Sequence, residues 1–406
     1  MKRISILKNR VQEYAWGSLT AIPELLNKQG PYDKPQAELW MGAHPKAPSM
    51  VKCDGNWISL PELIEKNPED ILGKRVAEKF KSKLPYLFKV LAAAKPLSIQ
   101  AHPSLAQAKE GFERENELGI PLNAFSRNYK DDNHKPECIC ALTPLWALNG
   151  FRKISNILSL MDKICPDSLR NELNDLRKHS NSQGLKFFFN AVMTMDVKRK
   201  KQVTGNAIAN AQKILEDDPV FQWIINLHEE YPGDVGVLSP ILLNLIRLEP
   251  GQAMFLPAGE LHAYLGGVGI ELMANSDNVL RGGLTPKHVD VPELLRVLNF
   301  KEGEVKILLP EKRSETESVY SSQAEEFALS VIFTKESKIH TSPMNRSIEI
   351  LLCTDGKAII TDTGKNDKLA IAKGTSIIIP AAVEKYTIEG EATIYKAAVP
   401  VSGKIP

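Results

Sequence analysis

The stretch PGQAMFLPAGELH, residues 250–262, decides the fold predicted for this chain. Gly251 permits a tight turn after one apolar strand, and Pro257 with Gly259 shapes a second turn that presents the next strand. The pattern predicts a β unit of short strands that holds His262 at a fixed place. A lone histidine after a turn is more often a surface or core residue than a ligand, so its function depends on its neighbours.

A weaker copy of this frame occurs in KGTSIIIPAAVEK, residues 373–385. Gly374 and Pro380 keep the spacing, whereas Ala382 and Lys385 replace the second glycine and the histidine. The repeat predicts a duplicated β-barrel with one functional and one silent copy. The first copy resembles the second motif of cupins, small jelly-roll β-barrels whose histidine points into the barrel.

Two polar residues alternate with apolar ones in PLSIQAHPS, residues 96–104. On a strand, Gln100 and His102 would share one face, because successive side chains point to opposite sides. The pair has two interpretations: a hydrogen-bonded polar pair in the core, or half of a metal site.

A carboxylate completes the second interpretation. Glu137, in DDNHKPECICAL, follows a proline and opens an apolar strand, so we expect it at the mouth of the barrel. Together with Gln100, His102 and His262 it offers two imidazoles, one carboxylate and one amide oxygen. This set suits Zn²⁺ and also accommodates other divalent first-row metals.

The texture of the sequence changes along the chain. We predict one catalytic cupin-like β domain from residues 1–150 and 243–320, and a C-terminal jelly-roll-like β domain over 321–406. Apolar residues at helical spacing predict an all-helical insertion over 151–242. The predicted fold is therefore mainly β with α, built from two jelly-roll barrels, the second of them degenerate.

Two local signals predict smaller features. Ser104, with Gln107 three residues later, forms a capping-box pattern that predicts the start of a helix. The pair Asp355 and Gly356 lies between apolar runs in SIEILLCTDGKAIITD and predicts a β-hairpin.

Composition excludes several classes of protein. The 406 residues include 51 basic and 49 acidic residues without a basic block, so we expect no nucleic-acid partner. The five scattered cysteines predict no disulfide framework and a reducing compartment, with a structural role for Cys138 and Cys140. No apolar run has the length of a membrane span or signal segment, so we expect a cytoplasmic protein without a membrane partner.

Several long segments resemble the signatures of type I mannose-6-phosphate isomerases. They include EYAWGS, AELWMGAHPKAPS, LPYLFKVLAAAKPLSIQAHPS, DDNHKPE, LTPLWALNGFR and FLPAGELHAYLGGVGIELMANSDNVLRGGLTPKHVDVPELL, and the match spans residues 10–155 and 243–300. The resemblance implies one zinc ion per chain on Gln100, His102, Glu137 and His262. It also implies interconversion of mannose 6-phosphate and fructose 6-phosphate through an enediolate.

This chemistry requires a base beside the carbonyl group and a cation for the developing charge. The resemblance makes Arg281 the first candidate, because its fixed charge suits a phosphate or an enediolate. Lys135, Glu271 and Asp277 are candidates for the base or the ring-opening acid, and the sequence does not decide among them.

Four further residues are candidates for substrate contacts. Ser98, on the same predicted face as Gln100, and Lys287, beside Arg281, are candidates for phosphate binding. Tyr264 is predicted either to line the pocket or to pack in the core. Lys89 lies within an apolar strand and either reaches the site or extends to solvent.

Two other functions remain open at this point. A facial set of two histidines and one carboxylate could hold Fe²⁺ in a cupin oxygenase, although Gln100 would fill an open position. A non-catalytic sugar-phosphate-binding protein is the second alternative, and the intact set of candidate residues argues against it. We expect a monomeric enzyme that serves GDP-mannose synthesis or mannose breakdown.

Overall fold

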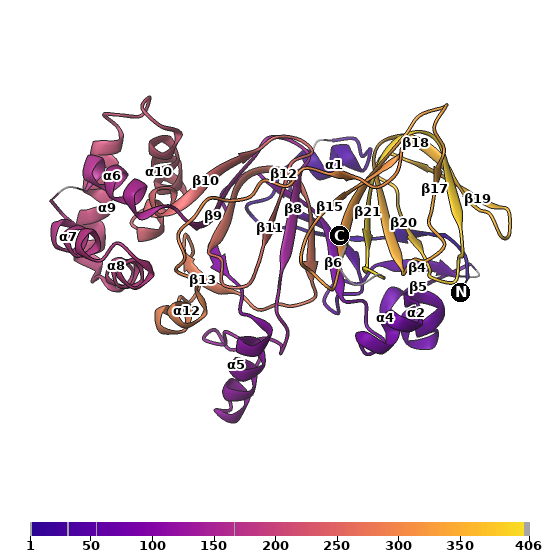
Figure 1. Ribbon diagram of the computed structural model, residues 1–406, viewed down its shortest axis with the longest axis horizontal. Helices are drawn as coiled ribbons and strands as arrows, with labels where there is room; N and C mark the ends of the chain where they lie inside the picture. Colours follow the sequence, from indigo (N-terminus) through magenta and orange to yellow (C-terminus); the bar gives the residue numbers. More distant parts are fainter. Residues whose placement is uncertain (1, 31, 54, 166, 402–406) are drawn as a thin grey trace.

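The computed structural model describes residues 2–30, 32–53, 55–165 and 167–401. Two large antiparallel sheets form the body of the molecule. A cluster of helices lies at one end of the molecule and the C-terminal strands lie at the other (Figure 1). The strands of the first sheet and the segments beside them carry the predicted site residues.

The long strand β12 (His262–Ala274) organises the first sheet. Its first residues pair with β7 and β9, and its later residues pair with β6 and β8. His262 consequently lies directly opposite Gln100. The other strands of this sheet are β2 (Arg10–Gln12), β3 (Glu38–Gly42), β6 (Tyr86–Ala93), β7 (Ile99–Ala101), β8 (Glu137–Ala141), β9 (Leu145–Phe151), β10 (Leu243–Leu248), β11 (Ala253–Leu256) and β13 (Leu280–Gly283).

Strand β6 shows how the sequence creates a polar interior beside an apolar core. Tyr86, Phe88 and Val90 point into a core shared with the second sheet, because alternate side chains lie on one face. The intervening side chains, which include Lys89 and Leu91, line a cavity on the other face. Lys89 therefore reaches the site, which was one of its two predicted positions.

The second sheet includes strands from both ends of the chain. Its members are β1 (Ser5–Lys8), β4 (Met50–Cys53), β5 (Asn56–Ser59), β14 (Glu311–Lys312), β15 (Glu317–Tyr320), β16 (Ala328–Thr334), β17 (His340–Thr341), β18 (Glu349–Asp362), β19 (Asp367–Ala372), β20 (Ser376–Ile379) and β21 (Tyr386–Ala398). Strand β1 pairs with β20 and β4. The sheet therefore crosses the predicted domain limits at residues 150 and 321, and the domain division stays a prediction.

The internal repeat predicted from sequence has a counterpart in the strand pairing. In each copy a four-residue strand, β11 or β20, precedes a strand of thirteen residues, β12 or β21. Leu256 lies opposite Glu137 in the first sheet, and Ile379 lies opposite Glu349 in the second. Glu349 thus occupies in the second sheet the place that Glu137 has in the first.

The prediction of a mainly β fold with helices is confirmed, but its barrels are not closed. The strand order runs from β10 to β2 in the first sheet and from β14 to β5 in the second. Among the described residues, no pair of hydrogen-bonded strands joins the ends of either order. Both sheets are open and share a core between them.

The β-hairpin predicted at Asp355 and Gly356 is wrong, because the chain does not turn there. Strand β18 continues through both residues and pairs with β21 along its length, with a register shift between Cys353 and Asp355. Gly356 has a φ of 74°, which places it in the left-handed region at this bulge. Long-range pairing with β21 therefore overrides the local turn signal.

Helices occupy the segment between β9 and β10, as the apolar spacing predicts. They are α6 (Ile154–Ile164), α7 (Arg170–Lys178), α8 (Ser182–Thr194), α9 (Val197–Ala211), α10 (Pro219–Glu230), the 3₁₀ turn η1 (Val235–Leu238) and α11 (Ser239–Leu242). Side-chain oxygens of Asn181, Asp196 and Asp218 cap three of them. Their apolar faces form a core of their own that continues onto the first sheet.

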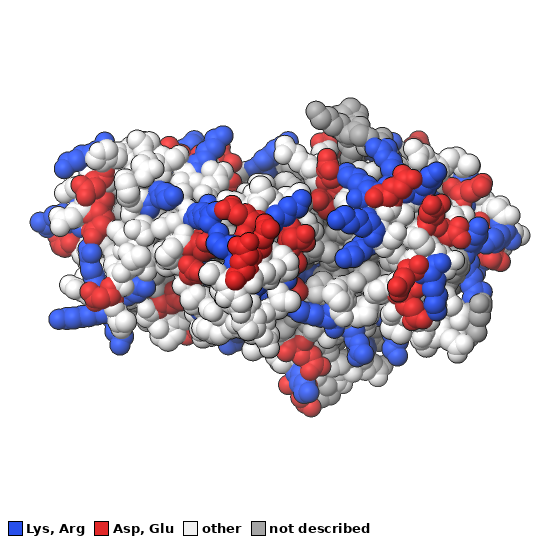
Figure 2. All heavy atoms as spheres, turned by 90° about the horizontal axis from the view of Figure 1, so that it is seen from below, with Lys and Arg blue, Asp and Glu red and all other residues white. Residues whose placement is uncertain are grey.

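Further helices surround the two sheets. They are α1 (Ala21–Leu25), α2 (Leu60–Lys66), α3 (Pro68–Leu72), α4 (Lys74–Lys79), α5 (Leu105–Glu117) and α12 (Val291–Val297). None of the helices in the described part of the chain has the length and apolar character that a membrane crossing requires. Acidic and basic side chains are intermixed on the face seen in Figure 2.

Candidate active site and metal centre

Local sequence signals fix the chain around His102. Strand β7 ends at Ala101, and α5 begins at Leu105 after the predicted capping box. The Ser104 hydroxyl accepts from the Gln107 N–H at 3.3 Å, and the Gln107 amide oxygen accepts from the Ser104 N–H at 2.9 Å. The turn between strand and helix therefore holds His102 in a buried position.

Three of the four predicted ligands converge in the interior. His102, Glu137 and His262 each contribute one ligand atom to a group in which all atoms lie within 4.8 Å of one another. His102 Nε2 lies 3.3 Å from Glu137 Oε1, and His262 Nε2 lies 3.5 Å from Glu137 Oε2. Each of the three side chains is only 1% exposed.

The outer nitrogen of each histidine defines its tautomer. His102 Nδ1 lies 2.7 Å from the carbonyl oxygen of Asn278, and His262 Nδ1 lies 2.9 Å from that of Glu260. A carbonyl oxygen only accepts, so each Nδ1 carries a hydrogen, and in the neutral imidazole Nε2 then presents a lone pair. Both Nε2 atoms are buried, and neither has a hydrogen-bond partner among the residues that the structure describes. Two oriented imidazoles beside one carboxylate fit a divalent metal ion.

The charges of these groups also suit a metal. Burial, together with the Lys135 ammonium, lowers the pKa of His102 to about 4, so the imidazole is neutral near neutral pH. Burial alone would raise the pKa of Glu137. The Lys135 ammonium and the two imidazoles outweigh that effect and hold this pKa well below its usual range. Neutral imidazoles and an ionised carboxylate are the forms that bind metals.

Gln100 reaches the same region from strand β7. It lies directly opposite His262 on one side and Arg281 on the other. Residues directly opposite each other in antiparallel strands share one face of the sheet, so all three side chains lie on the face that carries the metal candidates. Gln100 also lines the cavity described next. Its role as a fourth ligand stays a prediction.

A cavity of about 360 Å³ lies over this group. It brings together the residues predicted for catalysis and for substrate contacts. They are Lys89, Ser98, Lys135, Tyr264, Glu271, Asp277, Arg281 and Lys287.

Lys89 forms the centre of a charged row on the cavity wall. It lies opposite Trp40 on one neighbouring strand and opposite Glu271 on the other. Its Nζ lies 2.8 Å from Glu271 Oε2 and 3.5 Å from Glu38 Oε1. Burial opposes the charge of Lys89, but the two carboxylates outweigh it and raise the pKa. Burial raises the pKa of Glu271, and nearby carboxylates add to this despite Lys89.

Glu137 has two further neighbours. Lys135 Nζ lies 2.9 Å from Glu137 Oε1, as expected from their proximity in sequence. The Tyr264 hydroxyl donates to Glu137 Oε2 at 3.3 Å. Burial and the nearby carboxylates raise the pKa of Tyr264 well above its usual value, so it remains a neutral donor. Tyr264 is buried and also lines the cavity, so both of its predicted positions apply.

Cations and one carboxylate occupy the rim. Asp277 lies 2.8 Å from Lys46 and 3.6 Å from His44. Burial would raise the pKa of Asp277, but these two partners lower it below its usual range. Burial lowers the pKa of Arg281, and burial with Arg281 lowers that of Lys287. Within the part of the chain that the structure describes, Arg281 forms no ion pair, so its charge is available to an anion.

Several cavity residues were not predicted. Glu38 and Trp40 alternate in β3 as Gln100 and His102 do near β7, and the Trp40 N–H donates to Glu38 Oε2 at 2.8 Å. That alternation could have predicted that both side chains lie on the cavity face of β3. Tyr231 gave no signal, because it arrives from the helical segment through folding.

Comparisons with known proteins agree with this geometry. The family model for the catalytic domain of type I phosphomannose isomerase matches residues 4–154. The model for the cupin domain of mannose-6-phosphate isomerase matches residues 317–399. The mannose-6-phosphate isomerase of Salmonella typhimurium is 41% identical, over 92% of this chain and 94% of that protein. This chain belongs to the type I mannose-6-phosphate isomerase family.

Other members of the family have the same extent and fold. The Escherichia coli mannose-6-phosphate isomerase is 40% identical, over 95% of this chain and 96% of that protein. A crystal structure of a phosphomannose isomerase mutant from Salmonella typhimurium has a TM-score of 0.91 at 39% identity, and covers 98% of this chain and 100% of its own. A zinc-bound mannose 6-phosphate isomerase structure has a TM-score of 0.90 with the same identity and coverage. The predicted family and fold are confirmed, and the isomerase is favoured over the oxygenase and the binding protein.

Proposed function

We propose that this chain is a zinc-dependent enzyme that interconverts mannose 6-phosphate and fructose 6-phosphate. The observation that carries the proposal is the buried group of His102, Glu137 and His262 beneath a polar cavity, with the Arg281 guanidinium at its rim. Relatives that share 40% or more of their residues with it over nearly the whole chain bear the name of this isomerase.

The metal would bind to His102 Nε2, His262 Nε2 and the carboxylate of Glu137, with Gln100 as the fourth ligand. A bound divalent ion supplies electrophilic stabilisation for sugar oxygens. The surroundings favour a cation electrostatically, because Glu38, Glu137 and Glu271 outnumber the ammonium groups of Lys89 and Lys135.

The reaction moves one proton between neighbouring carbons of the sugar. A general base works best when its pKa is near the working pH. Among the three candidates, burial and nearby carboxylates raise the pKa of Glu271, whereas His44 and Lys46 lower that of Asp277. We therefore favour Glu271 as the base. Lys135 then serves as a donor to a substrate oxygen, because its ammonium already lies at the cavity floor.

The phosphate group would bind at the rim. Arg281 carries a guanidinium without an ionic partner among the described residues, and Lys287 and Ser98 line the same cavity. A phosphate held there anchors the sugar away from the reacting carbons, so binding energy positions the chain for proton transfer.

The cellular setting is a further part of the proposal. Cys138, Cys140, Cys165 and Cys353 carry free thiols, which suits the reducing cytoplasm. We propose a monomer that acts on a small sugar phosphate and supplies or consumes mannose 6-phosphate in GDP-mannose synthesis or mannose breakdown.

Two measurements test the function. Metal analysis of the purified protein is expected to find one zinc ion per chain, and a coupled assay is expected to detect fructose 6-phosphate formed from mannose 6-phosphate. Exhaustive chelation is expected to abolish turnover, and added zinc to restore it. Full activity without metal would contradict the metal site, and no turnover by the zinc-loaded protein would contradict the isomerase.

A further inference from the structure

Asn278 is a fully buried amide between two irregular segments of the site. Its side-chain oxygen accepts from the backbone N–H groups of Lys130 at 2.7 Å and Asp131 at 3.3 Å. Its side-chain nitrogen donates to the carbonyls of Asp131 at 2.8 Å and Asn133 at 2.9 Å. Its own backbone carbonyl is the oxygen that accepts from His102 Nδ1 at 2.7 Å. One residue therefore links a candidate ligand to the segment that leads to Glu137.

Asp131 and Ser276 reinforce the link between these segments. The carboxylate of Asp131 accepts from the Ser276 hydroxyl at 2.7 Å and from the backbone N–H of Asp277 at 2.7 Å. The Ser276 hydroxyl also accepts from the backbone N–H of Asn278 at 3.1 Å. The cavity residue Asp277 is thereby held between two anchored neighbours.

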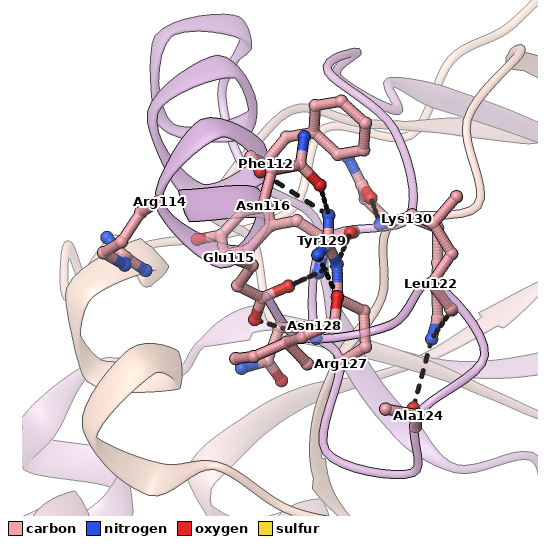
Figure 3. A network of polar contacts seen from close by, with 12 residues as sticks. Phe112, Arg114, Glu115, Asn116, Leu122, Ala124, Arg127, Asn128, Tyr129 and Lys130 are labelled. Carbon is pink, nitrogen blue, oxygen red and sulfur yellow. Dashed lines mark hydrogen bonds and ion pairs between the residues drawn. The ribbon is translucent and has the colours of Figure 1, made fainter. Parts of the chain in front are cut away.

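The segment that Asn278 grips is itself anchored on its outer side (Figure 3). Arg127 fills the loop after α5 and donates to the Asn116 side chain at 2.7 Å and the Ile120 carbonyl at 2.6 Å. It also pairs with Glu115 at 2.8 Å, and Glu115 accepts from the backbone N–H of Tyr129 at 2.9 Å. Because both sides of residues 128–133 are anchored, a change at Asn278 cannot be absorbed by free movement of that segment.

We propose that Asn278 is a positioning residue for the metal centre. Through its carbonyl it orients the His102 imidazole, and through its side chain it holds the segment that carries Lys135 and Glu137 at a matching depth. The inference rests on the proposed metal site. Partners that orient a ligand in this way change metal affinity by about 10- to 100-fold when they are replaced.

The chemistry of the site requires an amide at this position. The side chain must accept from two N–H groups on one side and donate to two carbonyls on the other. An aspartate has the same shape but lacks the two donor hydrogens, so one carboxylate oxygen would face the carbonyls of Asp131 and Asn133. A buried acceptor placed against other acceptors loses its bonds and pays the cost of desolvation.

The decisive variant is Asn278→Asp, studied as the full chain. Zinc affinity is measured by competition with a chelator of known affinity, at a temperature where the metal-free variant and the parent are both folded. We expect the zinc dissociation constant to rise about 10- to 100-fold. A parent protein that binds no zinc would refute the proposed metal site instead, so the two failures are distinguishable.

Asn210→Asp is the matched control. The Asn210 amide donates to the Ile164 carbonyl at 3.0 Å within the helical segment, so the same atoms change at a place without contact to the site. We expect this variant to lose stability but to keep parental zinc affinity. If Asn278→Asp also keeps parental zinc affinity, with loss of stability alone, Asn278 is a scaffold residue and the proposal is wrong.

A milder pair of variants decides the question if Asn278→Asp does not fold. Ser276→Ala removes the hydroxyl that joins Asp131 to the Asn278 backbone, whereas Ser276→Thr keeps a hydroxyl there. We expect Ser276→Ala, which loses the bonds to the Asp131 carboxylate and the Asn278 N–H, to weaken zinc binding by roughly 2- to 10-fold, and Ser276→Thr to recover it. Equal affinity of Ser276→Ala and the parent would overturn the proposal.

Discussion

Glu137 is the side chain on which the candidate site converges. Its oxygens lie 2.9 Å from Lys135 Nζ, 3.3 Å from His102 Nε2 and 3.5 Å from His262 Nε2. A buried carboxylate needs such partners, because an unpaired charge in the interior is costly. The ion pair with Lys135 thus stabilises the charge of Glu137 and also holds an ammonium group at the floor of the cavity.

A substitution at Arg281 tests how the site binds the negative charge of the substrate without removing a metal ligand. Arg281→Ala is expected to keep its zinc and to lose about 100- to 1000-fold in kcat/KM, the usual effect of removing one positioned donor from an active site. Metal analysis and steady-state kinetics check this outcome. Arg247→Ala is the control, because Arg247 lies on the same sheet in an exposed pair with Glu249. Parental kinetics for Arg281→Ala would remove Arg281 from the site.

His340 predicts a pH dependence in the second sheet. Burial, together with the Lys396 ammonium, lowers its pKa to about 4. The unfolded chain, with an ordinary histidine pKa of about 6.5, takes up the proton first. Stability therefore falls as the pH drops from about 6.5 towards 4, with a loss of about 2 kcal/mol between about pH 7 and pH 5.

Unfolding by urea at several pH values measures this effect. His340→Gln is expected to show a flatter pH profile than the parent, because the residue that protonates on unfolding is absent. His179→Gln is the control, since His179 is exposed on the helical segment. Parallel profiles for His340→Gln and the parent would show that this histidine does not titrate on unfolding.

Among the elements, α5 shows how packing can reverse a local preference. An alanine normally stabilises a helix relative to glycine by up to about 1 kcal/mol. At Gly111, however, an added Cβ would lie 2.3 Å from the ring of Tyr129. We expect Gly111→Ala to destabilise the protein by about 1–3 kcal/mol, the usual effect of overpacking.

Gly205 in α9 provides the matched comparison. Apart from its chain neighbours and the nearby backbone of the helix itself, no atom of the described residues lies within 4 Å of a Cβ added there. Gly205→Ala is therefore expected to stabilise the protein by about 0.5–1 kcal/mol. Thermal unfolding of the two variants should move in opposite directions, and a shift in the same direction would contradict the packing argument.

The elements also show which features the sequence predicts. The helix after Ser104 was predictable because its capping box lies within four residues of sequence. The alternation of polar and apolar residues around Gln100 and His102 likewise predicted that these two side chains lie on one face of a strand. The hairpin at Asp355 was wrong because pairing with β21, nearly forty residues away, decides the path of β18. Lys46 likewise meets Asp277 only after β3 and the end of β12 are brought together.

At the scale of the whole molecule, the second sheet contains a buried charge cluster of its own. Lys396 Nζ lies 2.6 Å from Glu317 and 3.5 Å from Glu349, with all three side chains nearly inaccessible. Removing one member of such a cluster leaves an unpaired charge in the interior. Lys396→Met is therefore expected to lower the free energy of unfolding by about 3–5 kcal/mol while the zinc content stays at the parental value.

An exposed pair is the control for this prediction. Lys79 lies 2.8 Å from Glu325, and both side chains are largely exposed. Lys79→Met is expected to change the free energy of unfolding by less than about 1 kcal/mol. Equal effects of the two substitutions would show that burial does not increase the contribution of the Lys396 ion pairs to the free energy of unfolding.

The equivalent positions of Glu137 and Glu349 have a consequence for metal starvation. Glu349 is neutralised by Lys396 and Arg346, which are part of the chain and cannot dissociate. The histidines beside Glu137 are instead placed for a metal ion, which a chelator can remove. Loss of zinc should therefore speed amide hydrogen exchange in β7, β8 and β12 and leave β18 and β21 as protected as before. One half of the duplicated frame depends on a supply of trace metal, and the other half does not.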